Sequence, residues 1–169
     1  HRRLSIAQPK PRRHRAVEAL QWSSLWRWVD RSPNQPRQAQ WFINAQKDEG
    51  KRAREVVAGD DLFLITHRRV YEAYEELCRR GGLVDFAELL LRSHELWLES
   101  PDLLEHYQRR FQHVLVDEFQ DTNTIQYAWL RVLTGDRGRI VAVGDDDQSI
   151  YGWRGARIEN IHRFRQDFR

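Results

Sequence analysis

Two short apolar runs, each ending in acidic residues, constrain the fold of this chain more than any other feature. The first run, HVLVDE, spans residues 113–118, and the second, RIVAVGDDDQ, spans residues 139–148. An amphipathic stretch at about residues 123–133 lies between them and ends near Gly135. Two apolar strands joined by a helix indicate a β-α-β crossover with both strands buried in a parallel sheet. Because ligands of open parallel sheets bind beyond the carboxyl ends of the strands, we expect the chemistry of the chain at these acids.

Residues 36–110, ahead of the strands, show the periodicity of helices. The spacing predicts helices over residues 36–50, 62–80 and 84–99, and another that begins with Ser100 and Pro101. Gly50 and the pair Gly81-Gly82 are typical helix stops. The apolar residues expected on the inner faces of the three longer helices are Ala39, Phe42, Ile43 and Ala45, then Val70, Ala73, Tyr74 and Leu77, then Phe86, Leu89, Leu90 and Trp97.

The first 36 residues differ from the rest in charge and composition. They carry eight Lys and Arg residues against two acids, whereas the whole chain has a net charge of +3. Trp22, Trp26 and Trp28 fall within seven positions. One interpretation is a basic arm that touches nucleic acid, a second is an irregular tail, and a third is out-of-frame translation. The chain begins with His1 and contains no Met, so we expect it to be a piece of a longer reading frame.

Several classes of protein are disfavoured by composition. No apolar run approaches the about 18 residues that a membrane span needs, so we expect no membrane association. Cys78 is the one cysteine in the chain, which excludes a disulfide scaffold and favours a cytoplasmic location. The histidines show no metal-ligand spacing, so no zinc site is expected. Cys78 and Trp129 are expected to serve as apolar packing groups.

Asp117-Glu118 follows the first apolar run directly, which is the Walker B arrangement. An Asp at this position can hold Mg²⁺, because Mg²⁺ prefers one or two carboxylates together with substrate phosphates. A neighbouring Glu can orient and deprotonate the water that attacks a γ-phosphate. The alternative is that acids end a strand for solubility alone.

The second run leads into residues of a different kind. Gln148, at its end, can place an uncharged amide near the γ-phosphate and sense whether that phosphate is present. Tyr151, Trp153 and Arg154 follow among glycines. Exposed aromatic rings beside an Arg form a stacking platform for single-stranded bases. The alternative for the two aromatic residues is ordinary core packing.

The runs DEFQDTN (117–123) and VGDDDQSIYGWRGA (143–156) resemble motifs II and III of superfamily 1 helicases of the UvrD/Rep/PcrA type. The segments PRQAQWFINAQKDEG (36–50) and GGLVDFAELLLRSHELWL (81–98) resemble that family too, so the resemblance covers residues 36–169. It implies an ATP-dependent DNA helicase that uses Mg²⁺, moves 3′ to 5′ on single-stranded DNA and unwinds duplex DNA in repair, with repair proteins as possible partners.

The resemblance also implies a role for each matched residue. Asp117 would serve Mg²⁺, Glu118 would activate water, and Gln148 would contact the γ-phosphate of ATP and couple it to movement. The residues that would bind DNA are Tyr151, Trp153 and Arg154. For Gln120 and Asp121, which also belong to motif II, structural hydrogen bonding is the expectation.

The implied fold is α/β: a partial RecA-like P-loop NTPase domain with a parallel sheet at 111–169, preceded by an all-helical 1B-type insertion at 36–110. Residues 1–35 stay unassigned, as a disordered or out-of-frame segment. In the 1B-type segment, Lys47, Lys51 and Arg52 are candidate phosphate contacts, with a solvated helix face as the alternative.

The chain also departs from the family pattern. It contains no G-x-x-x-x-G-K-[ST] loop, no adenine-reading Gln segment and none of the family's later arginine motifs. We therefore expect negligible ATP hydrolysis by these 169 residues alone. Two alternatives stay open: a non-catalytic single-stranded DNA-binding or interaction module, and the remnant of a broken gene. A helicase-nuclease relative is a further enzymatic alternative.

Overall fold

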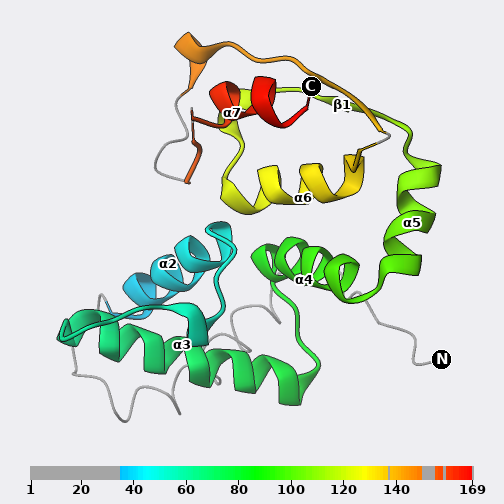
Figure 1. The fold of residues 1–169 in the computed structure, drawn as a ribbon. Helices are drawn as coiled ribbons and strands as arrows, with labels where there is room; N and C mark the ends of the chain where they lie inside the picture. The colour runs from blue at the N-terminus through cyan, green and yellow to red at the C-terminus, as the bar shows by residue number, and fades with distance from the viewer. Residues whose placement is uncertain (1–34, 137, 150–154, 158, 169) are drawn as a thin grey trace, which may run out of the picture.

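The computed structural model describes residues 35–136, 138–149, 155–157 and 159–168, which form helices and one small parallel sheet (Figure 1). Tyr151, Trp153 and Arg154 fall outside the described residues, as do residues 1–34. Among the described residues, no helix has both the length and the apolar character that a bilayer crossing requires.

The segment before the strands is helical, as the periodicity predicted. Its elements are α2 (Gln35–Asp48), the short 3₁₀ helix η2 (Ala53–Glu55), α3 (Leu62–Gly81), α4 (Phe86–Glu99) and α5 (Pro101–Arg110). The Asp61 carboxylate caps α3 by accepting hydrogen bonds from the backbone N–H groups of Phe63 and Leu64. Gly82 ends α3 in the left-handed conformation with φ 62°. Ser100 precedes α5, but its side chain makes no capping hydrogen bond.

A small apolar core joins α2, η2 and α3. It consists of Phe42, Ile43, Ala53, Val56 and Tyr71, all buried. The hydroxyl of Tyr71, whose side chain is fully buried, donates to the backbone carbonyl of Lys51 at 3.0 Å. Ala39, Phe42 and Ile43 are buried as predicted.

The inner face of α4 differs from the prediction. Phe86 and Leu89 are exposed, while Glu88, Leu91 and Trp97 are buried. The reason is that α4 packs on both α2 and α6. Glu88 pairs with Lys47 of α2, and Trp97 packs against Trp129 of α6. Trp97 is buried as expected.

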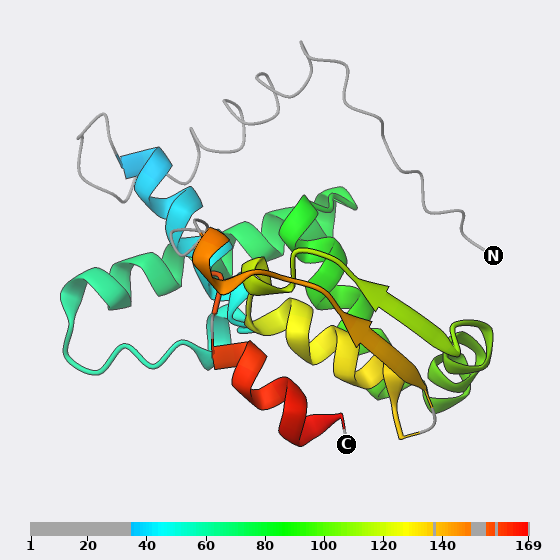
Figure 2. The ribbon, with the colours of Figure 1, turned by 90° about the horizontal axis from the view of Figure 1, so that it is seen from above.

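The strand-helix-strand unit was predicted correctly. It consists of β1 (His113–Val116), α6 (Thr124–Thr134) and β2 (Arg139–Ala142), and the two strands pair in parallel from His113↔Arg139 to Val116↔Ala142. The Asn123 side chain caps α6 in a reciprocal capping box with Gln126. The half-buried Trp129 of α6 packs against Trp97 with the rings tilted at 34° and their centroids 4.6 Å apart. Helix α6 lies below the two strands in Figure 1, and Figure 2 shows it running alongside them when seen from above.

The strands are less buried than predicted. Leu115 and Val141 are 74% and 57% exposed, and each strand alternates exposed with half-buried residues. This alternation is typical of a sheet that is covered on one face. Helix α7 (Glu159–Asp167) packs against α6 and the 3₁₀ helix η3 (Phe119–Asp121).

Candidate active site

Asp117 and Glu118 lie at the carboxyl end of β1, both exposed. The Asp117 carboxylate accepts a hydrogen bond from the backbone N–H of Glu118 at 2.9 Å. Glu118 has φ 53° and ψ 41°, and among the described residues it is the one non-glycine with positive φ. Such a conformation is unfavourable for a residue with a Cβ and is found preferentially at functional sites. The backbone is therefore turned sharply where the predicted water-activating carboxylate lies.

Gln120 lies beneath these acids and is 1% exposed. Its Nε2 donates to Glu118 Oε2 at 2.6 Å, and its Oε1 accepts from the backbone N–H of Asp145 at 3.0 Å. The predicted hydrogen-bonding role of Gln120 is confirmed. Asp121 differs from the prediction, because its Oδ1 is buried and has no hydrogen-bond partner.

Gln148 belongs to the 3₁₀ helix η4 (Asp146–Gln148), which follows β2. Its Nε2 donates to Asp145 Oδ2 at 2.7 Å, and the backbone N–H of Asp147 donates to Asp145 Oδ1 at 3.0 Å. The structure thus brings Gln148 to the same edge of the sheet as Glu118, with Asp145 and Gln120 between them. The predicted base-stacking residues that follow Gln148 lie outside the described residues.

The C-terminal end of α2 contacts the last residue of the first motif and the segment that follows the second motif. Asn123 donates to Asp48 Oδ1 at 3.0 Å, and Arg157 donates to Glu49 Oε1 at 2.6 Å. Burial raises the pKa of Asp48, and the hydrogen bond from Asn123 opposes that rise. Sequence periodicity had no means of finding these contacts, because their partners are 75 and 108 residues apart.

The acids at the end of β1 suit a hard divalent cation. In the described part of the chain, no three His, Cys, Asp or Glu side chains gather into a closed metal site. Mg²⁺ does not need such a site, because it keeps several waters and takes one or two carboxylates together with substrate phosphates. The exposed carboxylate of Asp117 fits that requirement.

Comparison with known proteins decides the family. A model of the UvrD/REP helicase N-terminal domain matches residues 5–169. The chain belongs to the UvrD/REP helicase family. The match begins at residue 5 and so extends further toward the N-terminus than the motifs indicated.

Named relatives agree with this assignment. The UvrD/REP chain is 62% identical to DNA helicase II of Escherichia coli (strain K12) over 133 residues, which is 79% of this chain and 18% of that protein. It is 54% identical to DNA helicase II of Haemophilus influenzae over 134 residues, again 79% of this chain and 18% of that protein. It is 38% identical to the ATP-dependent DNA helicase PcrA of Leuconostoc citreum over 141 residues, 83% of this chain and 19% of that protein. The chain thus spans about a fifth of the length of these relatives.

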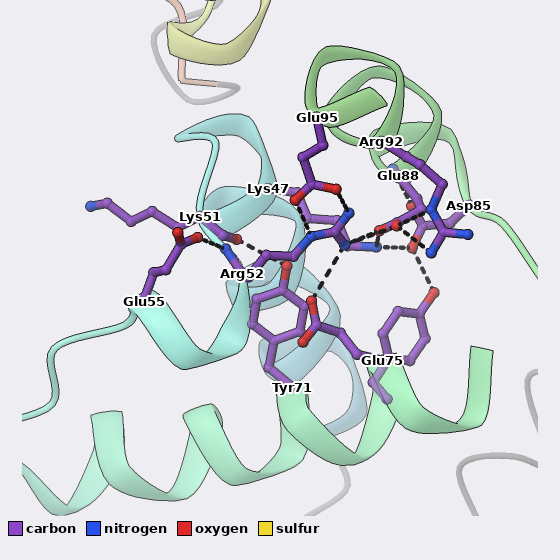
Figure 3. Close-up of polar contacts among 11 residues, drawn as sticks. Lys47, Lys51, Arg52, Glu55, Tyr71, Glu75, Asp85, Glu88, Arg92 and Glu95 are labelled. Carbon is purple, nitrogen blue, oxygen red and sulfur yellow. Dashed lines mark hydrogen bonds and ion pairs between the residues drawn. The ribbon is translucent and has the colours of Figure 1, made fainter. Parts of the chain in front are cut away.

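The prediction that Lys47 and Arg52 of this UvrD/REP chain contact phosphates is wrong, and so is the alternative of a solvated helix face. The Lys47 side chain is 2% exposed, and its Nζ lies 2.7 Å from Asp85 and 2.9 Å from Glu88 (Figure 3). Arg52 pairs with Glu88 at 2.8 Å and with Glu95 at 2.5 Å. The acids lie on or beside helix α4, far along the sequence, so the local pattern could not reveal them. Lys51 is exposed, as either interpretation required.

Hydrogen bonding keeps this buried network charged. Burial is the largest influence on Asp85 and Glu88 and acts to raise the pKa of each carboxyl. The contacts with Lys47, together with a hydrogen bond from Tyr74 to Asp85 and one from Arg52 to Glu88, hold both pKa values below their usual range. Burial acts to lower the pKa of Arg52, but its hydrogen bonds and ion pairs with Glu95 and Glu88 raise that pKa above its ordinary value. Asp85, Glu88 and Arg52 are therefore charged at neutral pH. The network joins α2 to α4, and it reaches α3 through Glu75, which lies 3.4 Å from Arg52.

Cys78 borders this network and is half-buried. Burial raises the pKa of its thiol, in keeping with the predicted packing role. The cavity that Cys78 lines together with Lys47 and Arg52 has a volume of about 20 Å³. A cavity of that size holds about one water molecule, so it is no nucleotide site.

Proposed function

We propose that the protein to which these residues belong is an ATP-dependent DNA helicase that hydrolyses ATP with Mg²⁺ and moves 3′ to 5′ on single-stranded DNA. The observation that carries the proposal is the meeting of two motifs at one sheet edge. The carboxylates of Asp117 and Glu118 follow β1, and Gln148 follows the adjacent parallel strand β2. Carboxyl ends of parallel strands are where such sheets bind nucleotides.

In this proposal the three residues act on different parts of the reaction. Asp117 holds Mg²⁺ on the phosphates of ATP, and Glu118 accepts a proton from the attacking water. Gln148 contacts the γ-phosphate and reports its presence. Tyr151 and Trp153, which follow Gln148 in sequence, stack on DNA bases with Arg154 beside them.

Support for the activity also comes from the relatives, whose names are DNA helicase II and ATP-dependent DNA helicase PcrA. A role in DNA repair and contact with repair proteins are part of the proposal. We further propose that residues 36–110 form a 1B-type insertion and residues 111–169 part of a RecA-like domain. The 169 residues contain no G-x-x-x-x-G-K-[ST] loop, so on their own they are expected to hydrolyse ATP negligibly.

The test is ATP hydrolysis by the complete protein in the presence of Mg²⁺ and single-stranded DNA. Glu118→Gln is expected to lower kcat by about 10²- to 10⁴-fold, because a positioned general base contributes that much. ATP and DNA binding should persist, since Glu118 acts on water. Glu99→Gln changes an exposed glutamate at the end of α4 and serves as the matched control.

The controls also separate the alternatives. Hydrolysis by Glu118→Gln within about twofold of the control would contradict the proposal. Salt-sensitive binding to single-stranded DNA that weakens in Trp153→Ala, without any DNA-stimulated hydrolysis, would instead support the non-catalytic binding module.

A further inference from the structure

The side chain of Gln120 makes two buried hydrogen bonds, although none of the chemical steps proposed above involves it. It is 1% exposed, and both ends of its amide are hydrogen-bonded. The nitrogen faces a carboxylate oxygen of Glu118, which can only accept, and the oxygen faces the backbone N–H of Asp145, which can only donate. One orientation of the amide alone satisfies both contacts. The Gln120 amide is therefore held in one orientation, with its nitrogen bonded to one oxygen of the Glu118 carboxylate.

Gly144 makes this arrangement sterically possible. A Cβ at position 144 would lie 2.4 Å from Gln120 Oε1 and 3.1 Å from the backbone nitrogen of Phe119. Such an approach is too close for any residue except glycine unless Gln120 moves. The backbone hydrogen bonds between the two segments continue past the strands, because the backbone N–H of Phe119 donates to the carbonyl of Val143 at 3.0 Å. Gly144 thus lets the loop after β2 sit directly against the Gln120 amide.

The contacts form a continuous path between the two motifs. Gln148 donates to the carboxylate of Asp145 at 2.7 Å, and the backbone N–H of Asp145 donates to Gln120 at 3.0 Å. Gln120 in turn donates to Glu118 at 2.6 Å. The predicted phosphate sensor and the predicted general base are therefore joined through two intermediate residues.

We propose that Gln120 is a positioning residue for ATP hydrolysis, which orients the Glu118 carboxylate and links it to Gln148 through Asp145. This inference rests on the proposed function. Gln120 touches neither nucleotide nor metal in this role, and it acts through Glu118. Loss of the amide leaves the carboxylate free to rotate away from the attacking water, while the groups that bind ATP stay in place. The effect should appear in kcat and not in KM.

The experiment measures DNA-stimulated ATP hydrolysis by the complete protein. Gln120→Met keeps the size of the side chain and removes both hydrogen bonds. We expect kcat to fall by about 10²-fold with KM for ATP unchanged, the size of loss that a misplaced catalytic group causes. Gly144→Ala, which pushes on the amide from the other side, should produce the same pattern and tests the idea should Gln120→Met fold poorly. Unchanged kcat in a folded Gln120→Met or Gly144→Ala protein would overturn the inference.

A control in the same loop separates positioning from general damage. Thr122 is buried, and its hydroxyl donates to the carbonyl of Phe119 at 2.8 Å and accepts from Asn160 Nδ2 at 3.3 Å, so neither of these contacts involves the Glu118 or Gln120 side chain. Thr122→Val should lower the melting temperature and leave kcat within about twofold. A kcat loss in Thr122→Val as large as that in Gln120→Met would show that the loop, and not the amide, is responsible, which would overturn the inference.

A double-variant cycle distinguishes failure of this inference from failure of the proposed function. If Gln120 acts through Glu118, the protein with both Gln120→Met and Glu118→Gln is no slower than Glu118→Gln alone. Multiplication of the two losses would overturn the positioning role while leaving the proposed function intact. Normal hydrolysis by Glu118→Gln itself would remove the proposed function, and the inference with it.

Discussion

Replacement of Lys47 by Met is the sharpest test of the buried charge network. The Lys47 ammonium lies 2.7 Å from Asp85 and 2.9 Å from Glu88, and its side chain is 2% exposed. Met has a similar shape and no charge, so Lys47→Met removes the cation that pairs with both carboxylates. Glu88 keeps its contact with Arg52 at 2.8 Å, whereas Asp85 keeps no cation among its described ion pairs.

The magnitude follows from burial. Removing one partner of a buried ion pair costs about 3–5 kcal/mol of unfolding free energy. The side chain of Asp85 is 27% exposed, so water offsets part of this cost and we expect the lower end, about 3 kcal/mol. For a domain of this size, that loss corresponds to a decrease in Tm of about 6–12 °C.

The assay is thermal and urea denaturation followed by circular dichroism, with Lys51→Met as the matched control. Lys51 is exposed, so its replacement should change the unfolding free energy by less than about 0.5 kcal/mol. Adding Asp85→Asn to Lys47→Met should recover part of the loss, because it removes the uncompensated charge. A Lys47→Met protein as stable as Lys51→Met would refute the reasoning.

Three further outcomes are expected. The pKa values of Asp85 and Glu88 in the folded state lie below their ordinary values of 3.8 and 4.5. Their contribution to the unfolding free energy is therefore complete above about pH 4.5 and falls as the pH is lowered. Urea titrations from about pH 3 to about pH 7 should show this decline, and Lys47→Met should make the decline smaller. Asn123→Ala removes the cap of α6 and should cost about 1 kcal/mol in the same assay, a value that an unchanged melt would contradict. Gly82 has φ 62°, and a Cβ at this position would meet nothing within 4 Å, so Gly82→Ala should cost about 1–2 kcal/mol through backbone conformation alone, detectable as a lowered Tm.

Local signals in the sequence predicted the elements well. The position of α6 follows from the amphipathic stretch at about residues 123–133, and its end follows from Gly135. Gly82 marks the end of α3 in the same way. The parallel pairing of the strands follows from their apolar character and the helix between them. Each of these features depends on residues that are close in the chain.

Features that depend on distant residues were missed. Lys47 and Arg52 look like surface cations on their own helices, and only the acids beside and on α4 make them buried. Phe86 is apolar and yet exposed, because the face of α4 that packs is chosen by α2 and α6. At the candidate site, the acids were found from their position after β1, but the supporting contacts of Gln120 depend on the loop after β2.

The two acids at the end of α2 hold together segments that are distant in the sequence. Asp48 accepts from Asn123, and Glu49 accepts from Arg157, across 75 and 108 residues of sequence. A change at Asp48 removes a hydrogen bond of the last residue of the first motif, and a change at Glu49 removes one of the residue that follows the second. The two residues of each pair are therefore expected to vary together among related sequences. We therefore expect the exchange of charge, Glu49→Arg with Arg157→Glu, to lower the melting temperature less than either substitution alone. The strand-helix-strand unit therefore packs with the end of α2, although a domain boundary drawn along the sequence would place α2 in a different unit.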